Sequence, residues 1–301
     1  MGSELVARLD VLAAALLFST GGAAIKACSL SSWQVASFRS AVACLVVLVI
    51  LPESRRRWSG RTLAVGFAYA ATMVLFVAAN KLTTAANTIF LQYTAPLYLV
   101  LAGPLLLDEA LRARDLAFLA IAGGSLSLFF VDAPVASASA PQPLLGNALA
   151  LLSGVSWAAT ALGLRWMART ESGGAPVATA VACGNLIALL AALPMALPVT
   201  AYTSLDVAMI LYLGVFQISG AYFFLTRGLR SVPVLEASLL LLLEPVLNPV
   251  WAWLAHGERP GPWSLAGGGV ILVATAVKSW DDARAAIRGT APDVQSHGCG
   301  A

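Results

Sequence analysis

The chain contains few charged residues, few cysteines and almost no histidine. Of its 301 residues only 11% are charged and 59% are hydrophobic, a balance that would leave a soluble domain of this length prone to aggregation. The four cysteines show neither zinc nor disulfide spacing, and two histidines provide no metal-ligand set. The composition therefore predicts an integral membrane protein that needs no metal ion and no cofactor.

Motifs for several other functions are also missing. The run Gly267-Gly268-Gly269 lies in an apolar segment and lacks the lysine and the Ser or Thr of a phosphate-binding loop. No Ser/His/Asp arrangement and no pair of carboxylates supports the alternative of a membrane-embedded enzyme. The few basic residues are membrane-topology signals and form no patch for nucleic acid. We therefore expect neither catalysis nor a nucleic-acid partner.

Long apolar runs dominate the chain instead. Each lasts about twenty residues, the length of a helix that crosses a bilayer, whereas barrel strands would alternate over ~10 residues. The pattern predicts an all-α membrane protein with ten spans. Their approximate ranges are Leu9 to Cys28, Trp33 to Leu51, Thr62 to Asn80, Ala86 to Leu107, Asp115 to Val131, Leu144 to Met167, Pro176 to Leu197, Leu205 to Leu225, Leu235 to His256 and Trp263 to Trp280.

The basic residues predict the orientation of these spans. If the N-terminus is cytoplasmic, most loop arginines fall on the inner side, and the outer side receives only Lys26, Lys81 and Arg259. The positive-inside rule then places both termini in the cytoplasm of a multi-pass inner-membrane protein. We expect Lys26 and Lys81 only to anchor the ends of their spans.

Two segments carry the same signature. Ala95-Pro96 is followed thirteen residues after the proline by Glu109, and Glu244-Pro245 is followed at the same distance by Glu258. A repeated helix indicates an internal repeat, and five spans per half would make the second half enter the membrane upside down. Inverted repeats are typical of secondary transporters with a site between the halves.

The repeat predicts the division of the chain. The expected parts are a first repeat at 1–132, a periplasmic linker rich in Pro, Ala and Ser at 133–143, a second, inverted repeat at 144–280, and a disordered cytoplasmic tail at 281–301. Monomer and homo-oligomer both remain open.

Several stretches resemble a known superfamily. The sequences ALLFSTGGAAIK, SFRSAVACLVV, LAIAGGSL and LAGGGVIL, with the two Pro/Glu helices, resemble the bacterial ten-helix drug/metabolite transporter superfamily with paired EamA-type repeats. The shorter strings LFST, QYTAP and SWAA resemble its aromatic amino acid exporters of the YddG type. The resemblance implies a secondary transporter that exports aromatic and other bulky apolar amino acids by alternating access. Export of drugs or other small metabolites is the alternative within the superfamily, and proton coupling and facilitated diffusion both stay open.

Glu244 is the most informative candidate for substrate binding. It lies near the middle of a span, where a charged side chain costs about 3 kcal/mol on insertion scales. Its counterpart in the first repeat is the apolar Ala95. Glu244 either binds a substrate amine, exchanges a proton, or is a protonated structural group bonded to a neighbouring helix.

Other candidates lie on the same two repeated helices. Gln92, Tyr93 and Asn248 are each within about a turn of Pro96 or Pro245. Each proline removes a backbone donor and is expected to kink its helix, either around a cavity or only for packing. Core packing is the commoner fate of a lone tyrosine, and the family resemblance favours the cavity for Tyr93.

Aromatic residues predict an apolar chamber. Trp157 lies too deep in its span for the interfacial aromatic belt, and with Phe76, Tyr93 and Tyr222 it could enclose an apolar side chain. Core packing is the alternative for each ring, and the family pattern favours the cavity for Trp157. Ser19, within the LFST string, is a further substrate contact that the resemblance implies.

Arg39 and the two repeated glutamates complete the candidates. Arg39 lies about two turns into its span and could bind a substrate carboxylate, although an arginine at this depth more often snorkels or pairs with another helix. Glu109 and Glu258 are expected to end their helices at opposite membrane faces, as structural or gate contacts. Because no other Arg or Lys lies mid-membrane, an amino acid fits better than a phosphorylated cargo.

Overall fold

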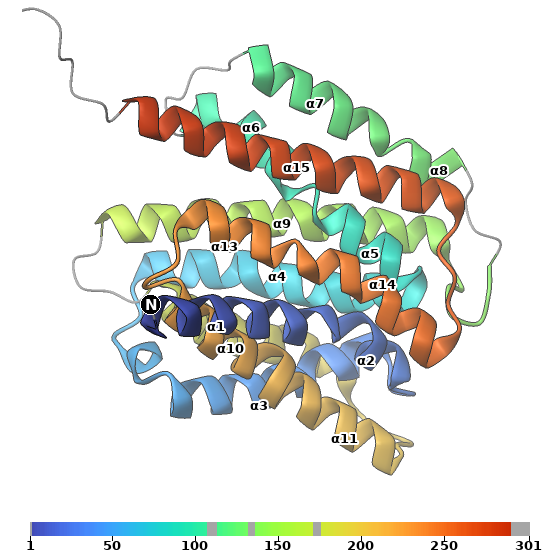
Figure 1. Ribbon diagram of the computed structural model, residues 1–301. Helices are drawn as coiled ribbons and strands as arrows, with labels where there is room; N and C mark the ends of the chain where they lie inside the picture. Colours follow the sequence, from blue (N-terminus) through green and yellow to red (C-terminus); the bar gives the residue numbers. More distant parts are fainter. Residues whose placement is uncertain (1, 107–112, 132–135, 171–175, 290–301) are drawn as a thin grey trace, which may run out of the picture.

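The computed structural model describes residues 2–106, 113–131, 136–170 and 176–289, and in these ranges the chain is helical without a β-strand. The helices pack into one bundle (Figure 1). In chain order they are α1 (Gly2–Ser19), α2 (Gly21–Ala27), α3 (Ser32–Ile50), the 3-10 turn η1 (Pro52–Arg55), α4 (Gly60–Leu82), α5 (Ala85–Gln92), α6 (Ala95–Leu106), α7 (Ala113–Ser125), α8 (Leu128–Val131), α9 (Pro143–Thr170), α10 (Pro176–Ala196), α11 (Ser204–Tyr212), the π-helical η2 (Leu213–Gly220), α12 (Ala221–Gly228), α13 (Val234–Leu241), α14 (Leu243–His256) and α15 (Pro262–Gly289).

Eight helical segments within the described ranges are long and apolar enough to cross a membrane. They match eight of the ten predicted spans closely, for example Ser32–Ile50 and Val177–Ala196. The fourth and the tenth predicted spans are also helical, but neither is a continuous apolar helix of spanning length. The fourth is broken between α5 and α6, and α15 carries four charged residues between Lys278 and Arg284.

Two helix breaks occur at equivalent places in the two halves. α5 gives way to α6 at Tyr93 and Thr94, directly before Ala95-Pro96. α13 gives way to α14 at Leu242, two residues before Glu244-Pro245. A proline cannot donate to the carbonyl four residues earlier, so each break leaves carbonyl oxygens without a helical partner. The repeated signature thus produces two interrupted helices.

Polar caps fix where several helices begin. The hydroxyl of Ser31 accepts the N–H of Gln34 ahead of α3, and Ser59 caps α4 in the same way through Thr62. Such caps satisfy donors that a helix start leaves free, which in a bilayer interface would otherwise be costly. The sharp helix starts therefore follow directly from Ser and Thr at the ends of the apolar runs.

Small residues let the central helices approach closely. α4 packs along α9 and α10, and α10 also packs along α3. A Cβ at Gly184 of α10 would lie 2.9 Å from the backbone oxygen of Gly66 on α4, and one at Gly163 of α9 would lie 2.5 Å from Val65. Small residues at such interfaces are typical of membrane helix packing.

Gly146 offers a test of this packing. A Cβ there would lie 2.7 Å from the backbone nitrogen of Thr83, so Gly146→Ala should lower the free energy of unfolding by about 1–3 kcal/mol through overpacking. Gly123→Ala is the matched control, because a Cβ at Gly123 on α7 meets nothing within 4 Å. Thermal unfolding in detergent should show a lower midpoint for Gly146→Ala alone. Equal midpoints for the two variants would contradict the close approach.

The last described helix, α15, extends further than the sequence predicts. α15 continues to Gly289, so the expectation of disorder from residue 281 is wrong for 281–289. The ammonium of Lys278 lies 2.6 Å from Asp282 one turn later, and the guanidinium of Arg284 lies over the ring of Trp280. These i,i+4 contacts extend the helix beyond its apolar part.

The bundle has two ends, and we name them by the position of the N-terminus. α1 begins and α9 and α15 end at the side where the N-terminus lies, which we call the N-terminal face; the opposite end is the distal face (Figure 1). At the N-terminal face three ion pairs involve α1, α12 and α13 or their adjoining turns. They are Arg8 with Glu236, Asp10 with Arg227, and Glu53 with Arg230.

Candidate functional site

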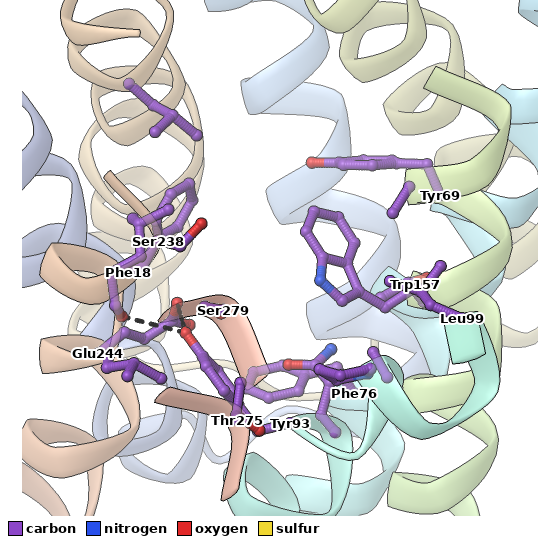
Figure 2. A pocket seen from close by; sticks show the side chains of 18 of the residues that line it. Phe18, Tyr69, Phe76, Tyr93, Leu99, Trp157, Ser238, Glu244, Thr275 and Ser279 are labelled. Carbon is purple, nitrogen blue, oxygen red and sulfur yellow. Dashed lines mark hydrogen bonds between the residues drawn. The ribbon is translucent and has the colours of Figure 1, made fainter. Parts of the chain in front are cut away.

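A cavity of 910 Å³ lies within the bundle, with walls from both halves of the chain. It brings together most of the substrate-binding residues that the sequence predicts, together with one of the two prolines. These are Arg39, Phe76, Gln92, Tyr93, Pro96, Trp157, Tyr222 and Glu244 (several are labelled in Figure 2).

The cavity extends toward the N-terminal face and not toward the distal face. α9 lines it with Trp157, Ala161 and Arg165, all from the half that ends at the N-terminal face, and α15 lines it from Thr275 to Asp282. No lining residue comes from the distal turns of α4, α9, α14 or α15. The structure therefore shows a site that reaches the N-terminal face.

Glu244 and Tyr93 meet on this cavity from opposite halves. The hydroxyl of Tyr93 lies 2.9 Å from Oε2 of Glu244 and 3.2 Å from the backbone oxygen of Leu241 (Figure 2). That carbonyl is the one that Pro245, four residues on, leaves without a helical donor. Within the described residues Glu244 forms no ion pair with a basic side chain. The two breaks thus place a carboxyl and a phenol side by side.

Arg39 contributes a buried positive charge on the α3 side. It is 1% exposed, its Nη2 donates to the carbonyl oxygen of Met73 at 3.0 Å, and its Nε has no partner. No described carboxylate lies within ion-pair distance of it. Arg39 does not snorkel to the surface, and it bonds to a neighbouring helix through the main-chain oxygen of Met73 on α4 and not through a carboxylate.

Aromatic rings form two apolar walls. Phe18 packs edge-on against Tyr222 with 5.1 Å between ring centroids, Tyr69 lies 5.9 Å from Tyr222, and Trp157 packs against the same cluster. Figure 2 shows Trp157 and Tyr69 on one side, with Phe18 and Glu244 facing them. The sequence interpretation missed Phe18 and Tyr69, although Phe18 stands in the LFST string and Tyr69 is a tyrosine deep in a span.

The polar side chains around these rings are held by helix contacts. Gln92 donates to the hydroxyl of Ser153 on α9 at 2.9 Å, which itself donates to the carbonyl oxygen of Thr72. Gln217 lines the cavity with an unpartnered side-chain oxygen. In the described ranges no three His, Cys, Asp or Glu side chains gather as metal ligands.

Four predicted residues lie away from the cavity. Ser19 is fully buried, donates to the carbonyl oxygen of Leu16 and accepts from the indole N–H of Trp251 at 2.9 Å. Asn248 and Pro245 are buried without lining the cavity. Glu258 pairs with Lys26 at the distal face, so Lys26 is more than an anchor. Glu109 lies outside the described residues.

Comparison with protein families shows where this architecture belongs. The model of the EamA-like transporter family matches twice, over residues 7–131 and 144–280. The chain belongs to the EamA-like transporter family. The cavity of this EamA-like protein is therefore built by two copies of one unit, with Tyr93 from the first and Glu244 from the second.

Structural comparison supports the same fold. A solved crystal structure aligns with this EamA-like chain at a TM-score of 0.61 and 20% sequence identity, covering 93% of this chain and 98% of the other. Comparison with curated protein sequences gives no significant match. The family comprises drug/metabolite transporters rather than enzymes, in agreement with a multi-pass helical membrane protein.

Proposed function

We propose that this protein is a secondary exporter of amino acids with aromatic or other bulky apolar side chains. The observation that carries the proposal is the combination, in one cavity, of aromatic walls with Arg39 and Glu244, neither of which has an ion-pair partner among the described residues. A zwitterion presents a carboxylate and an ammonium group, which such a cation and anion complement. The rings complement an apolar side chain.

The charge distribution argues against a phosphorylated cargo. Phosphate recognition uses several Arg or Lys side chains, whereas deep in this cavity Arg39 is the single cation among the described residues. Arg165 and Lys278 line the cavity nearer the N-terminal face, and Lys278 is already paired with Asp115 and Asp282 at 3.1 and 2.6 Å. The cavity therefore favours a solute with one negative group.

Alternating access of two inverted five-helix units is the mechanism we infer. Each family match begins with a long helix and contains one interrupted helix, α5–α6 in the first and α13–α14 in the second. Adding α5–α6 and α15 to the eight segments that are long and apolar enough to cross a membrane gives five spans per unit, an odd number that would invert the second unit. The arginines at the N-terminal face support an orientation with that face toward the cytoplasm, in the inner membrane.

Uptake into liposomes tests the proposal directly. Purified protein would be reconstituted and supplied with labelled phenylalanine, tryptophan, methionine and threonine, with and without a pH gradient. Saturable uptake of the apolar amino acids above protein-free liposomes supports the exporter. Absence of uptake for every amino acid would refute it, and a response to the gradient would identify proton coupling.

Export of drugs is the second candidate, because 910 Å³ is within the range of cavities that hold drug-sized molecules. A labelled cationic drug in the same panel separates the two functions. Transport of the drug without any amino acid would favour the second.

Trp157 should set the preference for large side chains. Trp157→Ala removes one aromatic wall, so we expect roughly a tenfold rise in the KM for tryptophan and phenylalanine, about 1.4 kcal/mol, and little change for threonine. Trp253→Ala is the control, because Trp253 lies on α14 and is 50% exposed. Equal KM values for all substrates in Trp157→Ala would remove this residue from the site.

A further inference from the structure

A buried ion pair lies at the distal face of the bundle. Lys26 Nζ lies 2.9 Å from Glu258 Oε2, and the two side chains are only 5% and 3% exposed. The ammonium also donates to the carbonyl oxygens of Thr83 and Ser139 at 2.8 and 2.6 Å. The other carboxylate oxygen accepts the backbone N–H of Ala85 at 2.6 Å. We call these five residues the distal latch.

The distal latch joins the two family units. Lys26, Thr83 and Ala85 belong to the first unit, Glu258 belongs to the second, and Ser139 lies between them. Taking an ion pair out of water costs much of what the pair gains, so the net stabilisation is small. When water enters and the two charges separate, each charge regains its hydration free energy. The free-energy difference between the closed and the open latch is therefore small, and the latch can open and close. Separating an apolar contact in water would bring no such gain.

Next to the distal latch, in the described part of the chain, lies a buried amide without a hydrogen-bond partner, since a Cβ at Gly22 would touch both Asn248 and Ala85 of the latch. Asn248 is fully buried, and among the described residues neither its side-chain oxygen nor its side-chain nitrogen has a hydrogen-bond partner. The backbone of α2 packs on this amide, because a Cβ at Gly22 would lie 2.7 Å from Asn248 Oδ1 and 3.1 Å from Nδ2. A buried amide without hydrogen bonds is costly and calls for an explanation. Water entering from the distal side would supply the missing partners.

The internal repeat gives an independent reason to expect that Asn248 lines the cavity when the cavity opens toward the distal face. Asn248 stands three residues after Pro245, and Leu99 stands three residues after Pro96. Leu99 lines the cavity that reaches the N-terminal face. In an inverted repeat, equivalent positions exchange surroundings when the site turns to the other side. The position of Asn248 therefore corresponds to a lining position of the distally open cavity.

We propose that the distal latch and the Gly22–Asn248 contact form the outer gate of the transport path, and that separation of α2 from α14 exposes Asn248 to substrate. The proposal rests on alternating access as the mechanism of the proposed function. Asn248 lies one turn from Glu244 on the same side of α14, so an opened gate extends the site along that helix. The amide then serves as a polar substrate contact in the distally open state.

Thiol labelling tests the gate without any substrate. Asn248→Cys would be made in protein with its four native cysteines changed to Ala, and labelled from the distal side with a membrane-impermeant methanethiosulfonate. We expect slow labelling, and at least tenfold faster labelling after Lys26→Gln and Glu258→Gln are combined. The combination leaves no lone buried charge. Glu236→Gln, at the exposed pair with Arg8 on the opposite face, is the control and should leave the rate unchanged.

Two results of the labelling would overturn the gate. Fast labelling with the distal latch intact would show that Asn248 is already accessible. An unchanged rate in the double variant, with folding verified by size-exclusion chromatography, would show that the ion pair does not hold the gate. Because no transport is measured, these results do not depend on the identity of the cargo.

A disulfide provides the second measurement. Gly22→Cys combined with Asn248→Cys should crosslink on oxidation, stop amino acid uptake and regain it on reduction. Uptake at the full rate with the crosslink formed would overturn the gate, and so would failure to crosslink. If the parent protein takes up no amino acid under oxidising or reducing conditions, the proposed export of amino acids is refuted. The labelling rates of Asn248→Cys still test the gate in that case.

Discussion

Glu244→Gln is expected to reduce amino acid uptake roughly thirtyfold. The glutamine keeps the shape and still accepts from Tyr93, but it loses the negative charge that complements the substrate ammonium. A hydrogen bond to a charged group contributes about 2 kcal/mol, which corresponds to that factor in KM. Initial uptake rates against phenylalanine concentration, in liposomes of equal protein content, measure the change.

An analogue without the amine makes this test specific. Phenylpropionate has no ammonium group, so its competition with labelled phenylalanine should be no weaker in Glu244→Gln than in the parent. Glu53→Gln is the matched control, because Glu53 pairs with Arg230 at the N-terminal face, away from the cavity. If Glu244→Gln keeps both full transport and the parent's response to a pH gradient, Glu244 neither binds the amine nor exchanges a proton.

Helix positions were predictable from the sequence because they depend on local patterns. Apolar runs of spanning length, ended by Ser or Thr caps and by prolines, predict α3 and α10 within a residue or two. The breaks before Pro96 and Pro245 are equally local, since a missing N–H acts on the same helix. The end of α15 was not predictable from apolar runs because ion pairs along the helix, such as Lys278 with Asp282, continue it.

Which side chains face the cavity was less predictable. Phe18 lines it while its neighbour Ser19 is buried against Trp251, and in a helix that is apolar on all sides the sequence holds no signal for that rotation. Asn248 shares a side of α14 with Glu244 yet is sealed under Gly22. The identity of the distal latch likewise depends on tertiary contact, since Lys26 and Glu258 are far apart in the sequence.

Arg39→Met is the second substitution with a large expected effect. It should weaken transport of amino acids without lowering the thermal stability of the protein. The guanidinium is buried without a counter-ion, so the empty protein bears its desolvation cost. Replacing such a charge with an apolar side chain of similar length is often neutral or stabilising. We therefore expect a thermal unfolding midpoint no lower than that of the parent, and at least a tenfold rise in the KM for phenylalanine.

The carboxylate of the substrate is what Arg39 should recognise. Phenylethylamine lacks this group, so the parent should prefer phenylalanine, and Arg39→Met should abolish the preference by losing about 2 kcal/mol of a charge-assisted bond. Arg39→Lys should restore part of it, because an ammonium provides the charge but not the two-pronged geometry. A variant that unfolds more easily yet still prefers phenylalanine would show that Arg39 supports the packing of α3 on α4 through Met73 and does not contact the substrate. Combined with the phenylpropionate result for Glu244, this comparison assigns each end of a zwitterion to one wall of the cavity.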